Sequence, residues 1–267
     1  MTTFSRYAVY YAPRPGAFAE AGAVWLGRNC ITGFPLAQPK LQGSLADLAP
    51  LTTKPRKYGF HGTLRAPFRL AEGEDAVSVV ACLTDLAKRL EPARCDGLEV
   101  GNPYGFGLAL KPVGDEAEIL KLAAAVVEHT DYLRAPLRPD EIAQREQSEN
   151  LNPRQRSYLH RWGYPMVMEE LCFQLTLSNR IDPNVQMELE TRASLHFNTV
   201  LPVPFVIEDL CLFGEEADTG MFRLLYRFPL NGSKRVISQS KKSCLPELDA
   251  LEQLDKATNL NQRYGKC

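Results

Sequence analysis

Two stretches of the sequence match each other in order and in residue type, which favours a fold built from a repeated unit. Residues 59–64 read Gly-Phe-His-Gly-Thr-Leu, and residues 172–177 read Cys-Phe-Gln-Leu-Thr-Leu. Phe, Thr and Leu coincide at an offset of 113 residues (His61 against Gln174), and a polar residue follows Phe in both. Because the same order of predicted elements follows each stretch, we expect two pseudo-symmetric lobes.

Hydrophobic periodicity and helix-cap residues predict the elements of these lobes. In the first repeat they are a strand over 58–70, a helix over 75–90 and strands over 97–101 and 105–112. In the second they are a strand over 170–181, a helix over 182–195 and strands over 204–213 and 221–230. Outside the repeats, we expect a strand over 6–12, a loop over 30–56 and helices over 17–28, 115–129, 139–148 and 153–162. One bilobed domain is expected over 1–230, followed by a polar linker and tail over 231–267 with a peripheral helix at 246–257.

Side-chain alternation along a strand gives each matched stretch a polar face and an apolar face. The apolar residues are Phe60, Gly62 and Leu64 in the first stretch, and Phe173, Leu175 and Leu177 in the second. The polar residues are His61, Thr63 and Arg65 in the first, and Gln174, Thr176 and Ser178 in the second. A single such strand is more typical of a half-exposed antiparallel sheet, but the pairing of two favours polar stripes that line a cleft between lobes.

Composition excludes several classes of protein. The 267 residues are 45% hydrophobic and 24% charged, which is typical of a folded chain with a core. The formal charge of -1 gives no global field that would favour nucleic acid. No apolar run approaches the length of a membrane span, and the N-terminus lacks a signal-peptide pattern. Seven cysteines without a Cys-x-x-Cys pair favour a reducing cytoplasm over disulfides or a zinc site.

The residues around the first stretch resemble a known superfamily. Residues 58–68 read Tyr-Gly-Phe-His-Gly-Thr-Leu-Arg-Ala-Pro-Phe, and Arg161-Trp-Gly-Tyr-Pro165 precedes the second stretch. Together they resemble the two-histidine (2H) phosphoesterases, in a bacterial branch linked to phosphonate metabolism, from about Arg6 to Leu230. The resemblance implies an α+β, bilobed, pseudo-two-fold fold with antiparallel sheets lining a central cleft and helices outside. It also implies attack on phosphodiesters, often cyclic ones, without a metal or other cofactor.

In that superfamily each lobe supplies one His-x-Thr motif. The resemblance implies that His61 is one acid–base residue and that Thr63 and Thr176 bind phosphoryl oxygens. Imidazole suits this chemistry because it titrates near neutrality. The second histidine is replaced by Gln174, whose amide can bind a phosphoryl oxygen but cannot exchange a proton at neutral pH.

Three explanations of Gln174 remain open from the sequence. The protein could be a natural binding-only or slow variant, the residue could be an introduced substitution that traps a ligand, or another residue could supply the proton. Cys172 lies on the same strand face, although a cysteine there is more typical of packing. Tyr10 or Tyr11, on the first strand, could reach the cleft with a hydroxyl, and the sequence does not decide which.

Further candidates concern the substrate. Arg65 could pair with phosphate oxygens, with a solvated edge position as the alternative, and Tyr164 loosely resembles a substrate-side position of the superfamily. The basic segment 234–242 favours a solvated tail over an RNA contact. His129, His160 and His196 fall on predicted helices and suit surface or capping positions.

Three functional hypotheses follow. The first is a cytoplasmic, monomeric 2H-type phosphodiesterase that acts on a small cyclic phosphodiester or nucleotide derivative. The second is a module that binds a phosphorylated ligand or an RNA end without turnover. The third is a scaffold whose cleft is vestigial. The sequence shows no Gly-rich phosphate loop and no Gly-x-Ser-x-Gly elbow.

Overall fold

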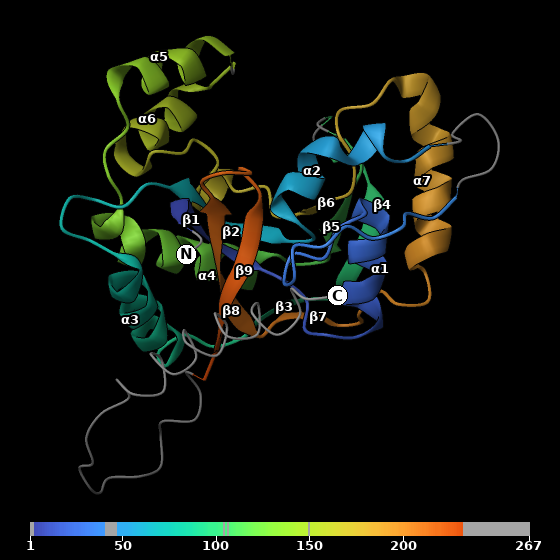
Figure 1. The fold of residues 1–267 in the computed structure, drawn as a ribbon, viewed down its shortest axis with the longest axis horizontal. Coiled ribbons are helices and arrows are strands. Elements are labelled where there is room, and N and C mark those ends of the chain that lie inside the picture. The colour runs from blue at the N-terminus through green and yellow to red at the C-terminus, as the bar shows by residue number, and fades with distance from the viewer. Residues whose placement is uncertain (1–2, 41–46, 104, 106, 149, 232–267) are drawn as a thin grey trace, which may run out of the picture. The chain divides into compact units, whose positions relative to one another are not determined.

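An antiparallel sheet organises the chain, with the strand order β4-β5-β6-β2-β1-β8-β9 (Figure 1). The computed structural model describes residues 3–40, 47–103, 105, 107–148 and 150–231, and these belong to one unit, Met1–Ser233. The strands of the sheet are β1 Phe4–Tyr11, β2 Gly62–Phe68, β4 Gly97–Gly101, β5 Ala109–Val113, β6 Leu175–Thr176, β8 Asp209–Glu216 and β9 Phe222–Pro229. A second, two-stranded sheet pairs β3 Ala93–Cys95 with β7 Phe205–Ile207. The predictions for the tail beyond residue 231, including its helix and basic segment, lie outside the described residues.

The helices largely follow the predicted ranges because their caps are encoded locally. They are α1 Ala17–Leu26, α2 Thr53–Tyr58, α3 Ala76–Ala87, α4 Ala117–Thr130, α5 Pro139–Ser148, α6 Pro153–Trp162 and α7 Pro183–Phe197. The Asp75 side chain caps α3 by accepting from the Ser78 amide, and Asn152 forms a capping box with Gln155 at α6. Gly27 ends α1 in the left-handed conformation. None of the described helices is both long enough and apolar enough to cross a membrane.

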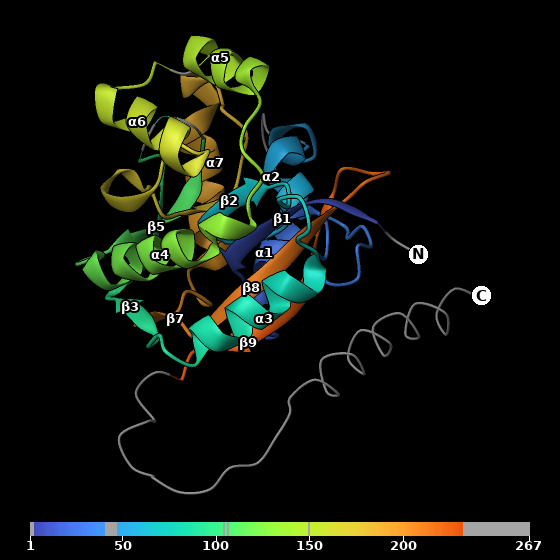
Figure 2. The ribbon, with the colours of Figure 1, turned by 90° about the vertical axis from the view of Figure 1, so that its left-hand side faces the viewer.

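Four helices bury their apolar stripes against one face of the sheet. Residues of α1, α3, α4 and α7 share a single core with the side chains that β1, β2, β5 and β6 direct to that face. Figure 2 shows α3 and α4 side by side along the sheet, and Figure 1 shows α1 beside α7. The opposite face carries a smaller apolar cluster around Tyr10, Phe213 and Phe222. Despite this cluster, we call this opposite side of the sheet the polar face, because the polar residues of the two matched motifs lie on it.

The strands correct three predictions. The helix α2 occupies the end of the expected loop 30–56 and the start of the expected strand 58–70, because the positive φ of Gly59 ends the helix just before β2. The expected strand 170–181 reduces to β6, because the chain forms a 3-10 turn at Met168–Glu170 and leaves the sheet when the Asn179 amide donates to Leu51. The expected strand 204–213 is divided between β7 and β8, which belong to different sheets.

The sheets also differ from the predicted pair of lobe sheets. Both matched segments enter one sheet, where β2 and β6 are neighbours. The order strand, helix, short strand, hairpin occurs twice, as β2-α3-β3-β4-β5 and as β6-α7-β7-β8-β9. The two short strands, β3 and β7, pair with each other.

Candidate functional site

The strand register brings the two matched motifs together. Antiparallel pairing sets Gly62 of β2 opposite Leu175 of β6. The next steps of this register place His61 opposite Thr176 and Thr63 opposite Gln174, and facing residues in an antiparallel pair project to the same side. Thr63, Gln174 and Thr176 are half-buried, whereas the alternating residues Phe60, Leu64, Phe173, Leu175 and Leu177 are buried in the core. The predicted apolar and polar stripes are confirmed for these residues.

The main chain sets the tautomer of His61. Its Nδ1 lies 2.9 Å from the carbonyl oxygen of Gly59, which can only accept, so Nδ1 carries the proton. Nε2 therefore presents a lone pair, and it lies 3.4 Å from Oγ1 of Thr63. Burial lowers the pKa of His61 to about 4, although the hydrogen bond to Gly59 acts in the opposite direction. At neutral pH this imidazole can accept a proton but holds none to donate from Nε2.

Gly59 makes this arrangement possible. Its φ of 82° is in the left-handed region, which glycine adopts without a steric penalty. A Cβ at this position would lie 2.5 Å from Cβ of Cys30. The turn that aims the Gly59 carbonyl at His61 therefore requires glycine both for its backbone conformation and for its close approach to Cys30.

The register decides between the two tyrosines of β1. Tyr10 pairs with Thr63 and lies on the polar face, where its ring centroid is 4.1 Å from that of His61. Burial, together with the nearby hydroxyls of Tyr58 and Tyr164, holds the pKa of Tyr10 well above its usual value. Tyr11 points into the core, and its ring meets Phe205 edge-on at 5.0 Å.

Tyr58 is a member of the site that the sequence did not single out. Its ring lies 5.7 Å from His61 and stacks on Phe222 at 5.0 Å, and the residue is half-buried. Its place at the start of the motif over 58–68 was a signal, but the spacing alone did not show that the end of α2 turns back toward His61.

Arg65 does not share a face with His61 and Thr63, so that prediction is wrong. The register shifts between Tyr10–Thr63 and Val9–Arg65, and this bulge turns the arginine toward the core face. Its guanidinium donates to the Val127 carbonyl at 2.8 Å and pairs with Asp131 at 3.0 Å. Ser178 also leaves the polar stripe, because it is buried and its hydroxyl donates to the Asn179 carbonyl.

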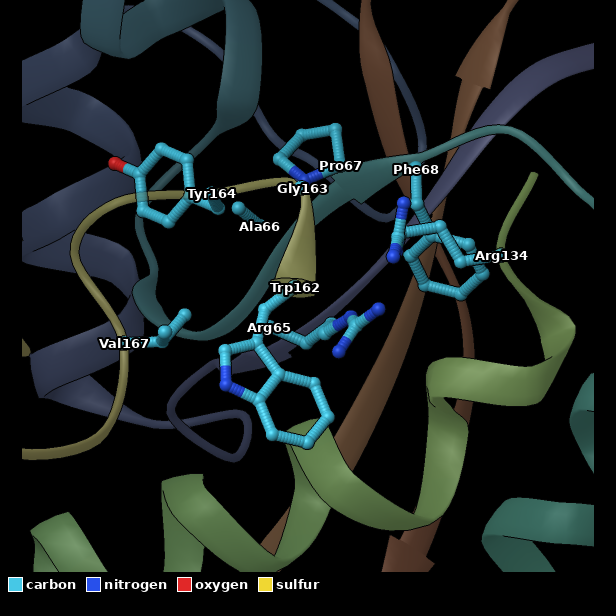
Figure 3. A pocket seen from close by; sticks show the side chains of 9 residues that line it. All are labelled: Arg65, Ala66, Pro67, Phe68, Arg134, Trp162, Gly163, Tyr164 and Val167. Carbon is cyan, nitrogen blue, oxygen red and sulfur yellow. The ribbon is translucent and has the colours of Figure 1, made fainter. Parts of the chain in front are cut away.

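Arg65 and Tyr164 line a small pocket beside this bulge (Figure 3). Its other lining residues are Ala66, Pro67, Phe68, Arg134, Trp162, Gly163 and Val167. Arg134 shares Asp131 with Arg65, so the guanidinium groups here already pair with a carboxylate. Tyr164 also lies close enough to Tyr10 to raise the pKa of that phenol.

The remaining predicted histidines have structural partners, as expected of helix residues. His129 bonds to the Ala125 carbonyl, His160 to Glu146 and His196 to the Ala21 carbonyl. The thiol of Cys172, one candidate for supplying a proton although packing was the more typical role, donates to the Glu170 carbonyl at 3.7 Å. Within the described residues, His, Cys, Asp and Glu form no group of three or more that could hold a metal ion.

The strands that flank the motif strands, β1 beside β2 and β5 beside β6, each carry a residue that forms an ion pair. On β1, Arg6 shares Glu215 with Lys57, whose Nζ lies 3.0 Å from the carboxylate. Burial would raise the pKa of Glu215, but the hydrogen bonds from Arg6, Lys57 and Ser5 lower it to about 2. On the other side, Lys111 of β5 pairs with Glu99 of β4.

Comparison with known proteins shows the family of the chain. Residues 63–223, more than half of the chain, match a family described as "Protein of unknown function (DUF1045)". The chain belongs to the DUF1045 family. The matched range begins within β2 and ends within β9, so it includes both β2 and β6.

Two curated proteins resemble this DUF1045 chain over most of its length. It is 34% identical over 250 residues to the ribose 1,5-bisphosphate phosphokinase PhnN of Janthinobacterium sp. (strain Marseille). The alignment covers 91% of this chain and 53% of that protein. It is 35% identical over 227 residues to the protein of the same name from Laribacter hongkongensis (strain HLHK9). This alignment covers 82% of this chain and 50% of that protein. The DUF1045 chain thus spans about half the length of these curated relatives.

A solved structure also aligns with the DUF1045 chain. The crystal structure of TT0787 of Thermus thermophilus gives a TM-score of 0.38 at 13% identity. The alignment covers 85% of this chain and 99% of that one.

Proposed function

We propose that this DUF1045 chain is a phosphodiesterase-like protein of 2H type that acts on a small cyclic phosphodiester or nucleotide derivative. The observation that carries the proposal is the register of β2 and β6, which sets His61, Thr63, Gln174 and Thr176 on one face. Among the described residues, the structure gives no hydrogen-bond partner to the Gln174 amide or the Thr176 hydroxyl. Both groups can therefore form hydrogen bonds with the oxygens of a ligand. The repeated element order supports a pseudo-two-fold relation between the motifs, and a central cleft between lobes remains part of this proposal.

In the proposed reaction a water molecule attacks phosphorus and His61 Nε2 takes the water's proton. The bond from phosphorus to the leaving oxygen breaks, and that oxygen takes its proton from a solvent water molecule. Thr63, Thr176 and Gln174 hydrogen-bond the phosphoryl oxygens. The proton-donor role of the second histidine is vacant, because an amide cannot supply a proton at neutral pH. A positioned acid is typically worth about 10²–10⁴ in rate, so the unmodified chain should turn over slowly.

A second candidate function is a binding module for a phosphorylated ligand or an RNA end at the same place. Two observations favour it. Gln174 can bind but cannot protonate, and burial keeps His61 uncharged at neutral pH. Such a module retains affinity for phosphate esters and shows no turnover that depends on His61.

The relatives suggest one substrate to include. Their shared name is that of a ribose 1,5-bisphosphate phosphokinase, and this chain spans about half of each. Opening a cyclic phosphate ester of ribose 5-phosphate yields a ribose bisphosphate. The phosphonate link implied by the 2H resemblance stays part of the proposal.

The test compares turnover of 2′,3′-cyclic nucleotides and a cyclic phosphate of ribose 5-phosphate by four proteins. They are the unmodified chain, His61→Ala, Gln174→His and, as a control, His129→Ala. We expect Gln174→His to gain about 10²–10⁴ in kcat, His61→Ala to lose turnover and His129→Ala to match the unmodified chain. Absence of turnover from all four, with melting temperatures raised by these ligands, would favour the binding module. No turnover and no ligand effect would refute both functions.

A further inference from the structure

The motif residues lack a charge that could balance a phosphate. Thr63, Gln174 and Thr176 are neutral side chains, and burial leaves His61 uncharged at neutral pH. Transferring an anion from water into a half-buried polar site is costly unless a cation or strong donors replace its hydration. A site of this composition therefore calls for a cation close by.

The register of β5 and β6 brings a cation beside Gln174. It pairs Ala109 with Thr176 and Leu110 with Leu175. Extending this register by one residue beyond the start of β6 sets Lys111 opposite Gln174. Facing residues in an antiparallel pair have Cβ atoms about 5 Å apart on the same side of the sheet. Leu110 is buried in the core and Lys111 is half-buried, so the lysine projects to the polar face.

We infer that Lys111 binds the phosphoryl group at this site, together with Gln174. This inference rests on the proposed function, because it assigns the cation of that same site. Lys111 pairs with Glu99 of β4 on one side, and on the other side β5 pairs with β6, which begins directly after Gln174. The flexible four-carbon stem of Lys111 lets the ammonium turn from one side to the other.

The present partner of Lys111 does not prevent this change. The Glu99 side chain is 53% exposed and that of Lys111 is 36% exposed, which makes their ion pair a solvent-screened one. Such pairs typically contribute little stability. Glu116 also lies close enough to interact electrostatically with Lys111. Without a ligand, the Lys111 ammonium interacts with the carboxylates of Glu99 and Glu116. A bound phosphate, with one or two negative charges, can replace them as its partner.

The other cations placed near the motifs are less suitable. Arg6 lies close enough to Tyr10 and Tyr58 to interact electrostatically with both. Arg6 and Lys57 are, however, bound to Glu215, whose side chain is only 8% exposed, so these ion pairs are less screened by solvent than that of Lys111. Arg65 is turned away by the bulge and bonded to Val127 and Asp131.

The test measures affinity for adenosine 2′-monophosphate and adenosine 2′,3′-cyclic phosphate by calorimetry at low salt. The variants are Lys111→Met, Lys111→Arg, Glu99→Gln and the control Lys121→Met, which removes the same charge from an exposed position on α4. Loss of one charge-assisted hydrogen bond should weaken binding by roughly tenfold or more in Lys111→Met. Lys111→Arg should recover most of the affinity, Glu99→Gln should bind more tightly, and Lys121→Met should be unchanged.

The opposite signs of Lys111→Met and Glu99→Gln separate ligand binding from a structural role, because loss of the ion pair alone would affect both variants alike. Equal affinity of Lys111→Met and Lys121→Met overturns the inference. If Lys111→Met does not fold, an unchanged affinity of Glu99→Gln overturns it. In either case turnover that depends on His61 would still support the proposed function. If the unmodified chain binds neither nucleotide, the inference that Lys111 binds a phosphoryl group is also refuted.

Discussion

His61 shows how single contacts fix the protonation state of a residue in the candidate site. The residue is 9% exposed, and its ring packs against Tyr10 and donates through Nδ1 to the Gly59 carbonyl. Burial favours the neutral imidazole, and the hydrogen bond to Gly59 places the proton of that neutral form on Nδ1, which leaves a lone pair on Nε2. At neutral pH the residue is therefore unprotonated at Nε2, which is the form that the proposed role as proton acceptor requires.

The first prediction concerns the pH dependence of stability. Because the pKa of His61 is about 4 in the folded chain and about 6.5 when unfolded, the unfolded state binds more protons between these values. Lowering the pH from 7 to 4.5 should therefore decrease the unfolding free energy of the unmodified chain by about 2–3 kcal/mol more than that of His61→Gln, whose side chain does not titrate. Urea denaturation at both pH values measures this difference. Equal losses in the two proteins would show that His61 is not buried as a neutral base.

The second prediction concerns Gly59. Gly59 and Gly73 have nearly the same φ, 82° and 84°, but a Cβ would clash with Cys30 only at Gly59. Gly73→Ala should lower the unfolding free energy by about 1 kcal/mol through backbone strain. Gly59→Ala should lower it by a further 1–3 kcal/mol or so, because the overpacked turn must shift. Thermal unfolding of both variants gives the comparison, and equal losses would exclude the clash.

Among the elements, most helices and the strands β1, β4 and β9 lie near their predicted ranges, whereas the segments around β6 and β7 do not. Helix ends depend on caps within a few residues, such as Asp75, and α3, α4, α5, α6 and α7 formed near the predicted ranges. Strands depend on partners that are distant in sequence. The β6 segment illustrates this, because its apolar alternation predicted a long strand and its neighbours allow only Leu175–Thr176.

The third prediction concerns the packing of β2 against β6. A Cβ on Gly62 would lie 2.5 Å from the ring of Phe173, so Gly62 gives the ring its space. Gly62→Ala should destabilise the chain by about 1–3 kcal/mol through overpacking. Combining it with Phe173→Leu should cost less than the sum of the single changes, because the smaller side chain leaves room for the methyl group. A double-mutant cycle from urea denaturation measures the coupling, and strict additivity would contradict the contact.

For the whole molecule, one long-range contact joins the two motif segments. Asn179, just after β6, receives a hydrogen bond from the Lys54 amide at 2.8 Å. Its side-chain amide donates to the Pro50 carbonyl and to Thr53, both at 2.8 Å. These bonds hold the start of α2, whose other end carries the Gly59 carbonyl that orients His61.

The fourth prediction follows from this contact. Asn179→Ala removes three side-chain hydrogen bonds and should lower the unfolding free energy by about 2–3 kcal/mol. Asn184→Ala is the control, because its side chain bonds only locally to Asp182 and should change stability by less than about 0.5 kcal/mol. If both variants unfold alike, Asn179 does not join the segments. Exchange of the amides of α2 should also be faster in Asn179→Ala alone.

The sequence by itself determined the α+β class, the main helices and the polar and apolar stripes of the matched motifs. These features rest on periodicity and caps, which act over a few residues. Tertiary structure decided that both motifs share one sheet, that Tyr10 rather than Tyr11 faces His61, and that a bulge removes Arg65 from the site. It also paired β5, which carries Lys111, with β6, which begins directly after Gln174, and the sequence carried no signal for this pairing. The physical reason is strand register: it is set by pairing between distant segments, and a shift of one residue exchanges the two faces of a strand.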